Sequence, residues 1–127
     1  MNIKKATAER LLAIPALVAI VGDRVYRKRL PQKVTIKPPH IIVWLLSKDR
    51  IVDHDGYAYT EATLQISCFS YDPDQADNMA VIVRESLESW PSEGTVMDSF
   101  FEGEDDLFEE STLVYHVALD FKISYHE

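Results

Sequence analysis

The sequence is poor in the residues that build disulfides, metal clusters and phosphate-binding loops. It has a single cysteine, Cys68, so no disulfide can form within the chain and no pair of thiolates is available to a metal. This cysteine usage suits a reducing cytosol. The four glycines are scattered along the chain, which argues against a glycine-rich phosphate loop.

A long hydrophobic run is also missing. The longest, residues 11–21, is interrupted by Pro15 and is shorter than the roughly 20 residues that cross a bilayer. Lysines at 4–5 precede it, as in a signal peptide, but Glu9 lies just before the run and no convincing cleavage site follows. We therefore expect no membrane span and no export signal, and interpret the segment as a packed helix pair.

Basic residues are scarce in the second half of the chain. Residues 1–50 hold eleven of the thirteen Lys and Arg and three acids, while residues 51–127 hold two bases and eighteen acids. The acidic half would repel phosphate, and the basic half lacks interleaved aromatics, so we expect no direct DNA binding. Opposite charges on one chain could guide association between neighbouring copies, or both could simply be solvated.

What the sequence does contain is enough apolar material for one core. A chain of 127 residues, 46% of them hydrophobic, is the size of one domain, which we expect to span residues 1–127. Residue spacing and proline placement predict two short helices, a brief strand and an exposed basic loop. These elements are expected at residues 3–14, 16–21, 24–26 and 27–39.

A hairpin and a helix are expected next. Residues 40–47 are β-branched and aromatic and predict a buried strand, and Asp55-Gly56 predicts the reversal into a second strand over 57–71. In that second strand, alternation predicts that Leu64, Ile66 and Cys68 face the core and that Thr63, Gln65 and Ser67 face away.

The segment after this hairpin carries strong helix signals. Asp72 is a suitable N-cap, Pro73 suits the first turn, and Gln75 stands where a capping-box partner belongs. Pro91 is expected to end the helix. Apolar residues recur at helical spacing and predict the face that covers the sheet: Ala76, Met79, Ala80, Val83, Leu87 and Trp90.

A second hairpin is expected to close the fold. Residues 96–101 predict a strand, and apolar residues at every second position from Leu113 to Tyr125 predict a half-buried strand of about thirteen residues. The order of elements predicts the α+β class, with an antiparallel β-sheet packed on one face by helices in a single-domain sandwich.

Between the last two strands lies an acidic stretch, which we interpret as a turn. Residues 102–110 hold six carboxylates but lack the alternating acids and bend glycine of a calcium loop, and residues 53–56 offer only a fragment of that pattern. A stretch this acidic is more typical of a solvated or partner-facing edge. We therefore expect no metal site and no cofactor.

Three polar residues on one face of the last strand are candidate metal ligands. At about 3.3 Å per residue, His116 lies about 13 Å from Asp120 and about 33 Å from His126, too far for one ion. Help from His40 or His54 stays open, but the simpler interpretation is surface histidines. With Cys68 on an apolar face, we expect no enzyme. A metal-dependent hydrolase using the 102–110 turn stays the alternative.

Several stretches together resemble the tail completion (tail terminator) family of long-tailed bacteriophages and prophages, long catalogued as a domain of unknown function. They are the N-terminal helix, GDRVYRKRLPQ at 22–32, IIVW at 41–44, LQISCFSYD at 64–72 with DQADNMA at 74–80, and LVYHVALDFKISY at 113–125. The matching stretches cover nearly the whole chain, although no single motif is diagnostic.

The resemblance implies a structural virion protein, assembled in the host cytoplasm, that caps the head-proximal end of the tail tube. It would stop tube polymerisation, contact the tail tube protein and head connector protein as a six-membered ring, and let DNA pass without sequence-specific binding. It could be a monomer in solution. Another neck protein, a head-completion or connector-adaptor subunit, is the alternative.

A head-to-tail ring needs two different, complementary patches on each subunit. We hypothesise that bases of one subunit meet acids of a neighbour or of a tail-tube subunit. The basic candidates are Arg27, Lys28, Arg29, Lys33 and Lys37, and the acidic ones are Glu104, Asp105, Asp106, Glu109 and Glu110.

Overall fold

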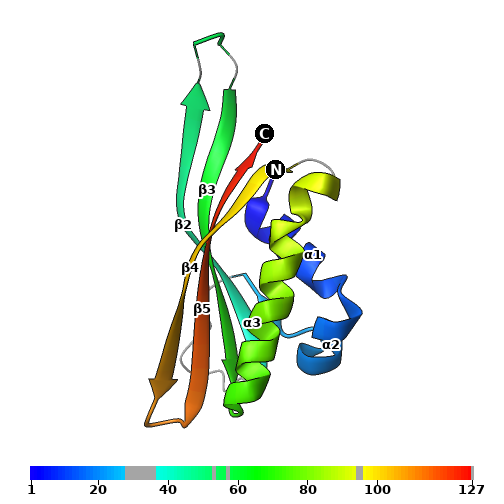
Figure 1. The fold of residues 1–127 in the computed structure, drawn as a ribbon, viewed down its shortest axis with the longest axis vertical. Coiled ribbons are helices and arrows are strands. Elements are labelled where there is room, and N and C mark those ends of the chain that lie inside the picture. Colours follow the sequence, from blue (N-terminus) through cyan, green and yellow to red (C-terminus); the bar gives the residue numbers. More distant parts are fainter. Residues whose placement is uncertain (28–36, 53, 57, 94–95, 127) are drawn as a thin grey trace.

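The computed structural model describes residues 1–127 apart from 28–36, 53, 57, 94–95 and 127. In the described residues three α-helices cover one face of a five-stranded sheet (Figure 1), which confirms the predicted α+β class. The elements are α1 (Ile3–Leu12), α2 (Pro15–Val21), β1 (Val25–Tyr26), β2 (His40–Val52), β3 (Ala58–Ser70), α3 (Pro73–Glu88), a 3-10 turn (Trp90–Glu93), β4 (Val96–Glu109) and β5 (Val114–Tyr125).

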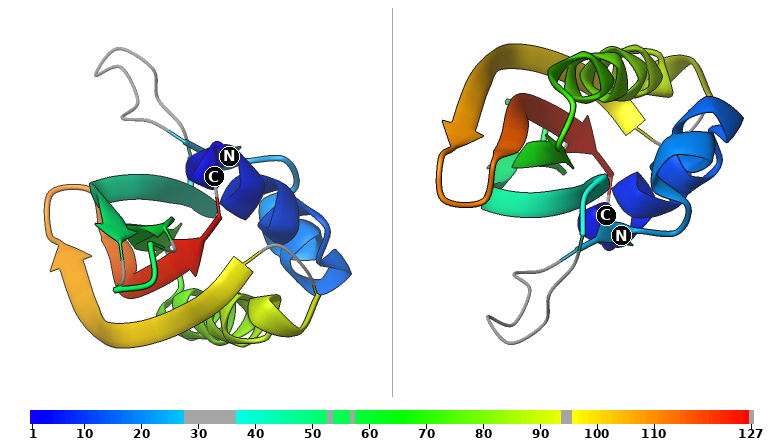
Figure 2. Two further views of the ribbon diagram at one scale, coloured as in Figure 1. Left: turned by 90° about the horizontal axis from the view of Figure 1, so that it is seen from above. Right: turned by 90° about the horizontal axis from the view of Figure 1, so that it is seen from below.

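The strand order of the sheet is β1-β2-β3-β5-β4, so β4 forms one edge and β1 with β2 forms the other. Neighbouring strands are antiparallel except β1 and β2, which run parallel where residues 25–26 meet residues 41–42. It follows that β2 and β5 point one way and β3 and β4 the other. Figure 2 shows that the sheet is strongly curled, and Figure 1 shows its two long hairpins reaching opposite ends of the molecule.

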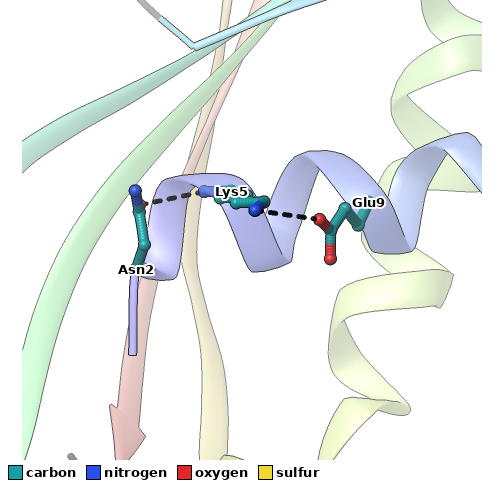
Figure 3. Close-up of polar contacts among 3 residues, drawn as sticks. All are labelled: Asn2, Lys5 and Glu9. Atoms are coloured by element: carbon teal, nitrogen blue, oxygen red, sulfur yellow. Dashed lines mark hydrogen bonds and ion pairs between the residues drawn. The ribbon is translucent and has the colours of Figure 1, made fainter.

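The N-terminal helices form as the sequence predicted. The side chain of Asn2 caps α1 by accepting a hydrogen bond from the backbone N–H of Lys5 at 3.1 Å, and Lys5 lies 4.0 Å from Glu9 one turn later (Figure 3). Leu11 and Leu17 are fully buried in the hydrophobic core. Within the described part of the chain, every helix is too short or too polar to cross a membrane.

The first hairpin is longer than predicted. We expected the strand to end at Ser47, but β2 continues to Val52 and reaches the reversal at Gly56, whose φ of 78° suits glycine. Lys48 and Arg50 are exposed yet extended, because each lies opposite a residue of β3 in an antiparallel ladder. Backbone pairing therefore overrides the polar character of this segment.

The helix α3 begins and ends where expected, but its cap differs in one detail. Asp72 accepts a hydrogen bond from the backbone N–H of Asp74 at 3.0 Å, as an N-cap should. The predicted capping box is wrong: the backbone N–H of Asp72 donates to Oγ of Ser70, and Ser70 in turn donates to Gln75. The end of β3 therefore supplies the partner that the helix itself was expected to provide.

One face of the sheet and the apolar stripe of α3 form the core. All six stripe residues predicted for α3 are buried, as are Leu64, Ile66 and Cys68 of β3. Opposite them on β5, Leu119 and Phe121 are fully buried as well. The alternation predicted for both strands is confirmed, although Ser67 on the opposite face of β3 is fully buried as well.

Candidate subunit interface

The acidic stretch forms an edge strand rather than the predicted turn. β4 runs to Glu109, and only Glu110 lies in the turn that precedes β5. Leu107 lies opposite His116 and Phe108 lies opposite Tyr115, so pairing with β5 holds the segment extended although Asp and Glu are poor strand formers. The acids at 104–110 are exposed, so their carboxylates keep their hydration in this conformation.

The basic candidates are described only in part. Arg27 follows β1, Lys37 precedes β2, and both are exposed. The start of β2 is tied to the helix end by Arg24, whose Nε donates to the backbone oxygen of Pro39 at 2.9 Å. The remaining predicted bases, Lys28, Arg29 and Lys33, lie outside the described residues.

The topology places these two charge sets at opposite edges of one sheet. Arg27 and Lys37 flank the edge formed by β1 and β2, whereas Glu104, Asp105 and Asp106 lie on β4 at the other edge. Strands β3 and β5 separate the two edges. One chain therefore carries two dissimilar edges of opposite sign, which is the property that head-to-tail association requires.

Apolar side chains are exposed among these acids. On β4, Phe100 is 60% exposed and Leu107 is 52% exposed, and Leu113 in the following turn is 63% exposed. Leu113 was predicted to begin the strand, but its φ of 59° lies in the left-handed region, which costs a leucine roughly 1–2 kcal/mol. Exposed apolar groups ringed by charge are typical of protein-binding surfaces.

A groove of about 280 Å³ lies between this hairpin and the start of α3. Ala76, Phe108 and Tyr115 contribute apolar lining, and Asp77 and Asp106 add acidic side chains. The hairpin of β4 and β5 therefore combines acidic side chains, exposed apolar side chains and an adjacent groove.

Two histidines are less exposed than the surface histidines that the sequence predicted. His40 is 7% exposed and His116 is half-buried, and their rings stack on the two sides of Phe69 with centroids 4.6 and 4.3 Å from it. Burial lowers the pKa of His40 from 6.5 to about 4, helped by Arg24 and His116. Burial also lowers the pKa of His116, against an opposing effect of Glu109. Both rings are therefore neutral at pH 7.

This row gives little support to metal or nucleophilic chemistry. The ring of Phe69 separates the two imidazoles, and no group of three or more His, Cys, Asp or Glu among the described residues is placed to hold a metal ion. Cys68 is fully buried, and burial raises the pKa of its thiol, which disfavours the reactive thiolate.

A family model described as "Tail completion protein gp17" matches residues 5–126. The chain belongs to this family. The resemblance seen in the sequence is thereby confirmed, and it extends over nearly the whole chain. Tail completion proteins are structural components of phage tails and are generally not enzymes.

The fold of this tail completion protein is shared with a solved structure. A chain from the "Virion of native gene transfer agent (GTA) particle" matches with a TM-score of 0.73 and 21% sequence identity, over 98% of this chain and 95% of that chain. At this level of identity the likeness shows the fold. No curated protein matches the chain.

Two exposed bases of the β2 edge, Lys48 and Arg50, are not among the predicted interface residues. Lys48 and Arg50 lie near the end of β2, on the same edge of the sheet as Arg27 and Lys37 but at the opposite end of that strand. A signal was available: ending the strand at Ser47 leaves a long connection before Asp55-Gly56, whereas hairpin loops usually have two to five residues. Loop length alone therefore favoured a longer strand.

Proposed function

We propose that this tail completion protein caps the head-proximal end of a phage or prophage tail tube, stops its polymerisation and joins the tail to the head. It acts as a homo-hexameric ring that contacts the tail tube protein on one side and the head connector protein on the other. The observation that supports this best is the pair of oppositely charged sheet edges in a chain of this family.

A ring closes only when each subunit presents two different surfaces that fit each other. Arg27 and Lys37 at one edge, and Glu104 to Glu110 at the other, provide surfaces of opposite sign. Because such exposed charges act mainly on the encounter and its register, a monomer in dilute solution is compatible with a ring on the tube.

The proposed ring surrounds the path of the DNA. The chain has a net charge of −8, so its surface as a whole repels phosphate. DNA is therefore expected to pass through the ring without sequence-specific binding, and no membrane takes part.

Tail length tests this function. Tails assembled without the protein are expected to grow to abnormal length and to lack heads, because nothing ends the polymerisation of the tube. Electron microscopy of particles from a deletion strain, with the gene supplied in trans as the control, measures both properties. Headless tails of normal length would instead indicate a connector-adaptor subunit of the neck, and joined particles of normal length would exclude either role.

Charge reversal on β4 tests the surface. The double variant Glu104→Lys, Asp106→Lys is expected to weaken ring formation or tube binding by about 10-fold at low salt, since attraction becomes repulsion. The effect should shrink at 1 M salt, where the Debye length is about 3 Å. Sedimentation with purified tubes measures the bound fraction.

The matched control carries the same change in charge on the helices. Glu9 and Glu88 are exposed, and each forms a surface ion pair within its helix. The variant Glu9→Lys, Glu88→Lys should bind tubes normally, because such pairs contribute less than about 1 kcal/mol. Unchanged binding by the β4 variant at low salt would contradict the assignment of these acids.

A further inference from the structure

Both edges of the sheet are long and open over the part of the chain that the structure describes. β4 is the last strand in the order and runs for 14 residues, and β2 is covered by β1 only at Ile41 and Ile42. From Trp44 to Val52 the outer edge of β2 carries no strand within the described residues. Each edge presents backbone N–H and C=O groups that another strand could pair.

Both edges carry exposed apolar side chains, which is unusual for edge strands that avoid pairing with other chains. Natural edge strands are usually short, charged or interrupted by proline, so that they do not pair with other chains. Here Leu46 and Val52 of β2 are 56% and 60% exposed, and Phe100, Leu107 and Phe108 are exposed on β4. Such strands have the features of surfaces that bind another strand.

On each edge, charged side chains at every second position lie on the same face of the sheet. Lys48 lies opposite Ala62 and Arg50 lies opposite Thr60, while Glu104 and Asp106 lie opposite core residues of β5. Directly opposed residues in an antiparallel ladder point to the same face. All four charges therefore lie toward the helix-bearing face, and all four are exposed.

We propose that neighbouring copies join edge to edge, with β4 of one copy pairing antiparallel with residues 44–52 of β2 in the next, so that their sheets become one continuous sheet. The inference rests on the proposed ring and names the surface that closes it. Hydrogen bonds between main chains would supply affinity, and alternate side chains would set the register.

The direction of pairing follows from the topology. Within one copy β2 and β4 are antiparallel, because β2 runs with β5 and against both β3 and β4. A second copy can be placed beside the first so that its β2 meets β4 of the first and the helices of both lie on the same face of the sheet. In this placement the strands of the second copy keep the directions that they have in the first. The new pair is therefore antiparallel.

Charge disfavours the alternative symmetric contact. A two-fold axis through the sheet would bring β4 against β4, and Glu104 and Asp106 would then meet acids of their own kind. Like charges directly opposite one another destabilise a strand pair. Head-to-tail pairing instead places Lys48 and Arg50 against those acids, as a closed ring requires.

One register satisfies both charge pairs. With Lys48 opposite Asp106, Arg50 falls opposite Glu104, since antiparallel partners move in opposite directions along their strands. The same register places Asp49 opposite Asp105 on the other face. That single repulsive pair makes the register testable, because removing it should strengthen assembly.

Cross-linking tests the register. Cys68 is fully buried, so cysteines introduced at exposed positions react selectively. On assembled tails, a short bismaleimide is expected to join copies of Lys48→Cys, Asp106→Cys into a ladder that ends at the closed ring. The control Lys48→Cys, Asp98→Cys moves one cysteine eight residues, about 27 Å, along β4 and should give no ladder. A ladder from the control alone, or from neither variant, would overturn the pairing.

Charge exchange tests the pairing energetically. Lys48→Glu, Arg50→Glu should weaken assembly on tubes at least 10-fold at low salt, and adding Glu104→Lys, Asp106→Lys should restore it to within about 3-fold. Lys4→Glu, Lys5→Glu on α1 has the same charge change as the first variant and should assemble normally. Asp49→Lys should tighten assembly. Failure of the fourfold variant to recover, with circular dichroism showing it folded, would refute the pairing.

These outcomes are separable from failure of the proposed function. If tails of the deletion strain are abnormal in length but the exchanged variants all assemble equally, the capping role stands and the edge pairing is wrong. If deletion leaves tails normal, the proposed function fails, and cross-linking of the purified protein at high concentration still reports on the pairing.

Discussion

Replacing Phe121 with alanine is expected to lower the free energy of unfolding by about 3–5 kcal/mol. The side chain is fully buried in β5, opposite Leu64 on β3, with its ring centroid 5.4 Å from that of Phe101 on β4. Its removal leaves a cavity that three strands border. Because domains of this size are stable by only about 5–15 kcal/mol, the variant should be close to unfolding at room temperature. Urea denaturation followed by circular dichroism measures the change.

Phe100, on the strand beside Phe121, provides a matched control. It is one of the exposed side chains of β4, so Phe100→Ala should change the free energy of unfolding by no more than about 0.5 kcal/mol. If Phe121→Ala does not yield soluble protein, Phe121→Leu should still show a loss below about 1.5 kcal/mol. Equal effects at positions 100 and 121 would contradict the assignment of the core face.

Acidification is expected to destabilise the protein between pH 6.5 and pH 4. The pKa of His40 is lowered to about 4 by burial, whereas the unfolded chain takes up this proton near 6.5. The unfolded state therefore binds more protons in this window, and stability falls as the pH falls. His40 alone should cost about 2–3 kcal/mol by pH 4, and the lowered pKa of His116 adds in the same direction.

Two histidine variants isolate this effect. His40→Phe removes the titrating group, so its free energy of unfolding should lose less than that of the native chain between pH 7 and pH 4.5. His54 is exposed in the first hairpin turn, and His54→Phe should keep the native slope. Urea denaturation at a series of pH values gives both slopes. A native slope in the His40 variant would show that other groups cause the acid sensitivity.

The charges near this histidine row act in opposite directions on the two rings. Arg24 and His116 both oppose a positive charge on His40, while Glu109 on the acidic edge favours one on His116. Protonating both histidines would place one positive charge on each side of the Phe69 ring. The row joins β2, β3 and β5, so acid should loosen the sheet whose edges are proposed to carry the assembly.

Much of the fold could be predicted because its signals are local. Asp72 and Pro73 mark the start of α3, the buried stripe from Ala76 to Leu87 repeats at helical spacing, and the alternation through β5 marks one buried face. Each pattern depends on residues within a few positions of each other. The family resemblance depended on the same stretches, and the family match confirmed it.

The errors arose where a distant strand decided the conformation. The acids of β4 were predicted to form a turn because Asp and Glu are poor strand formers. In the structure, β5 pairs with this segment as far as Glu109. Lys48 and Arg50 were placed in a connection, yet β3 pairs with them. His116 was predicted at the surface because it shares one face of β5 with Asp120, whereas in the structure its ring stacks on Phe69 of another strand.

The amino-acid sequence by itself determined the helices, the alternating faces of the strands and the separation of charge between the two halves of the chain, because these follow from periodicity and composition. Only the tertiary structure decided that the acidic segment is an extended edge and that the basic residues flank the opposite edge. Strand order depends on pairings such as β3 with β5, which lie far apart in sequence, and no local pattern specifies which strand remains outermost.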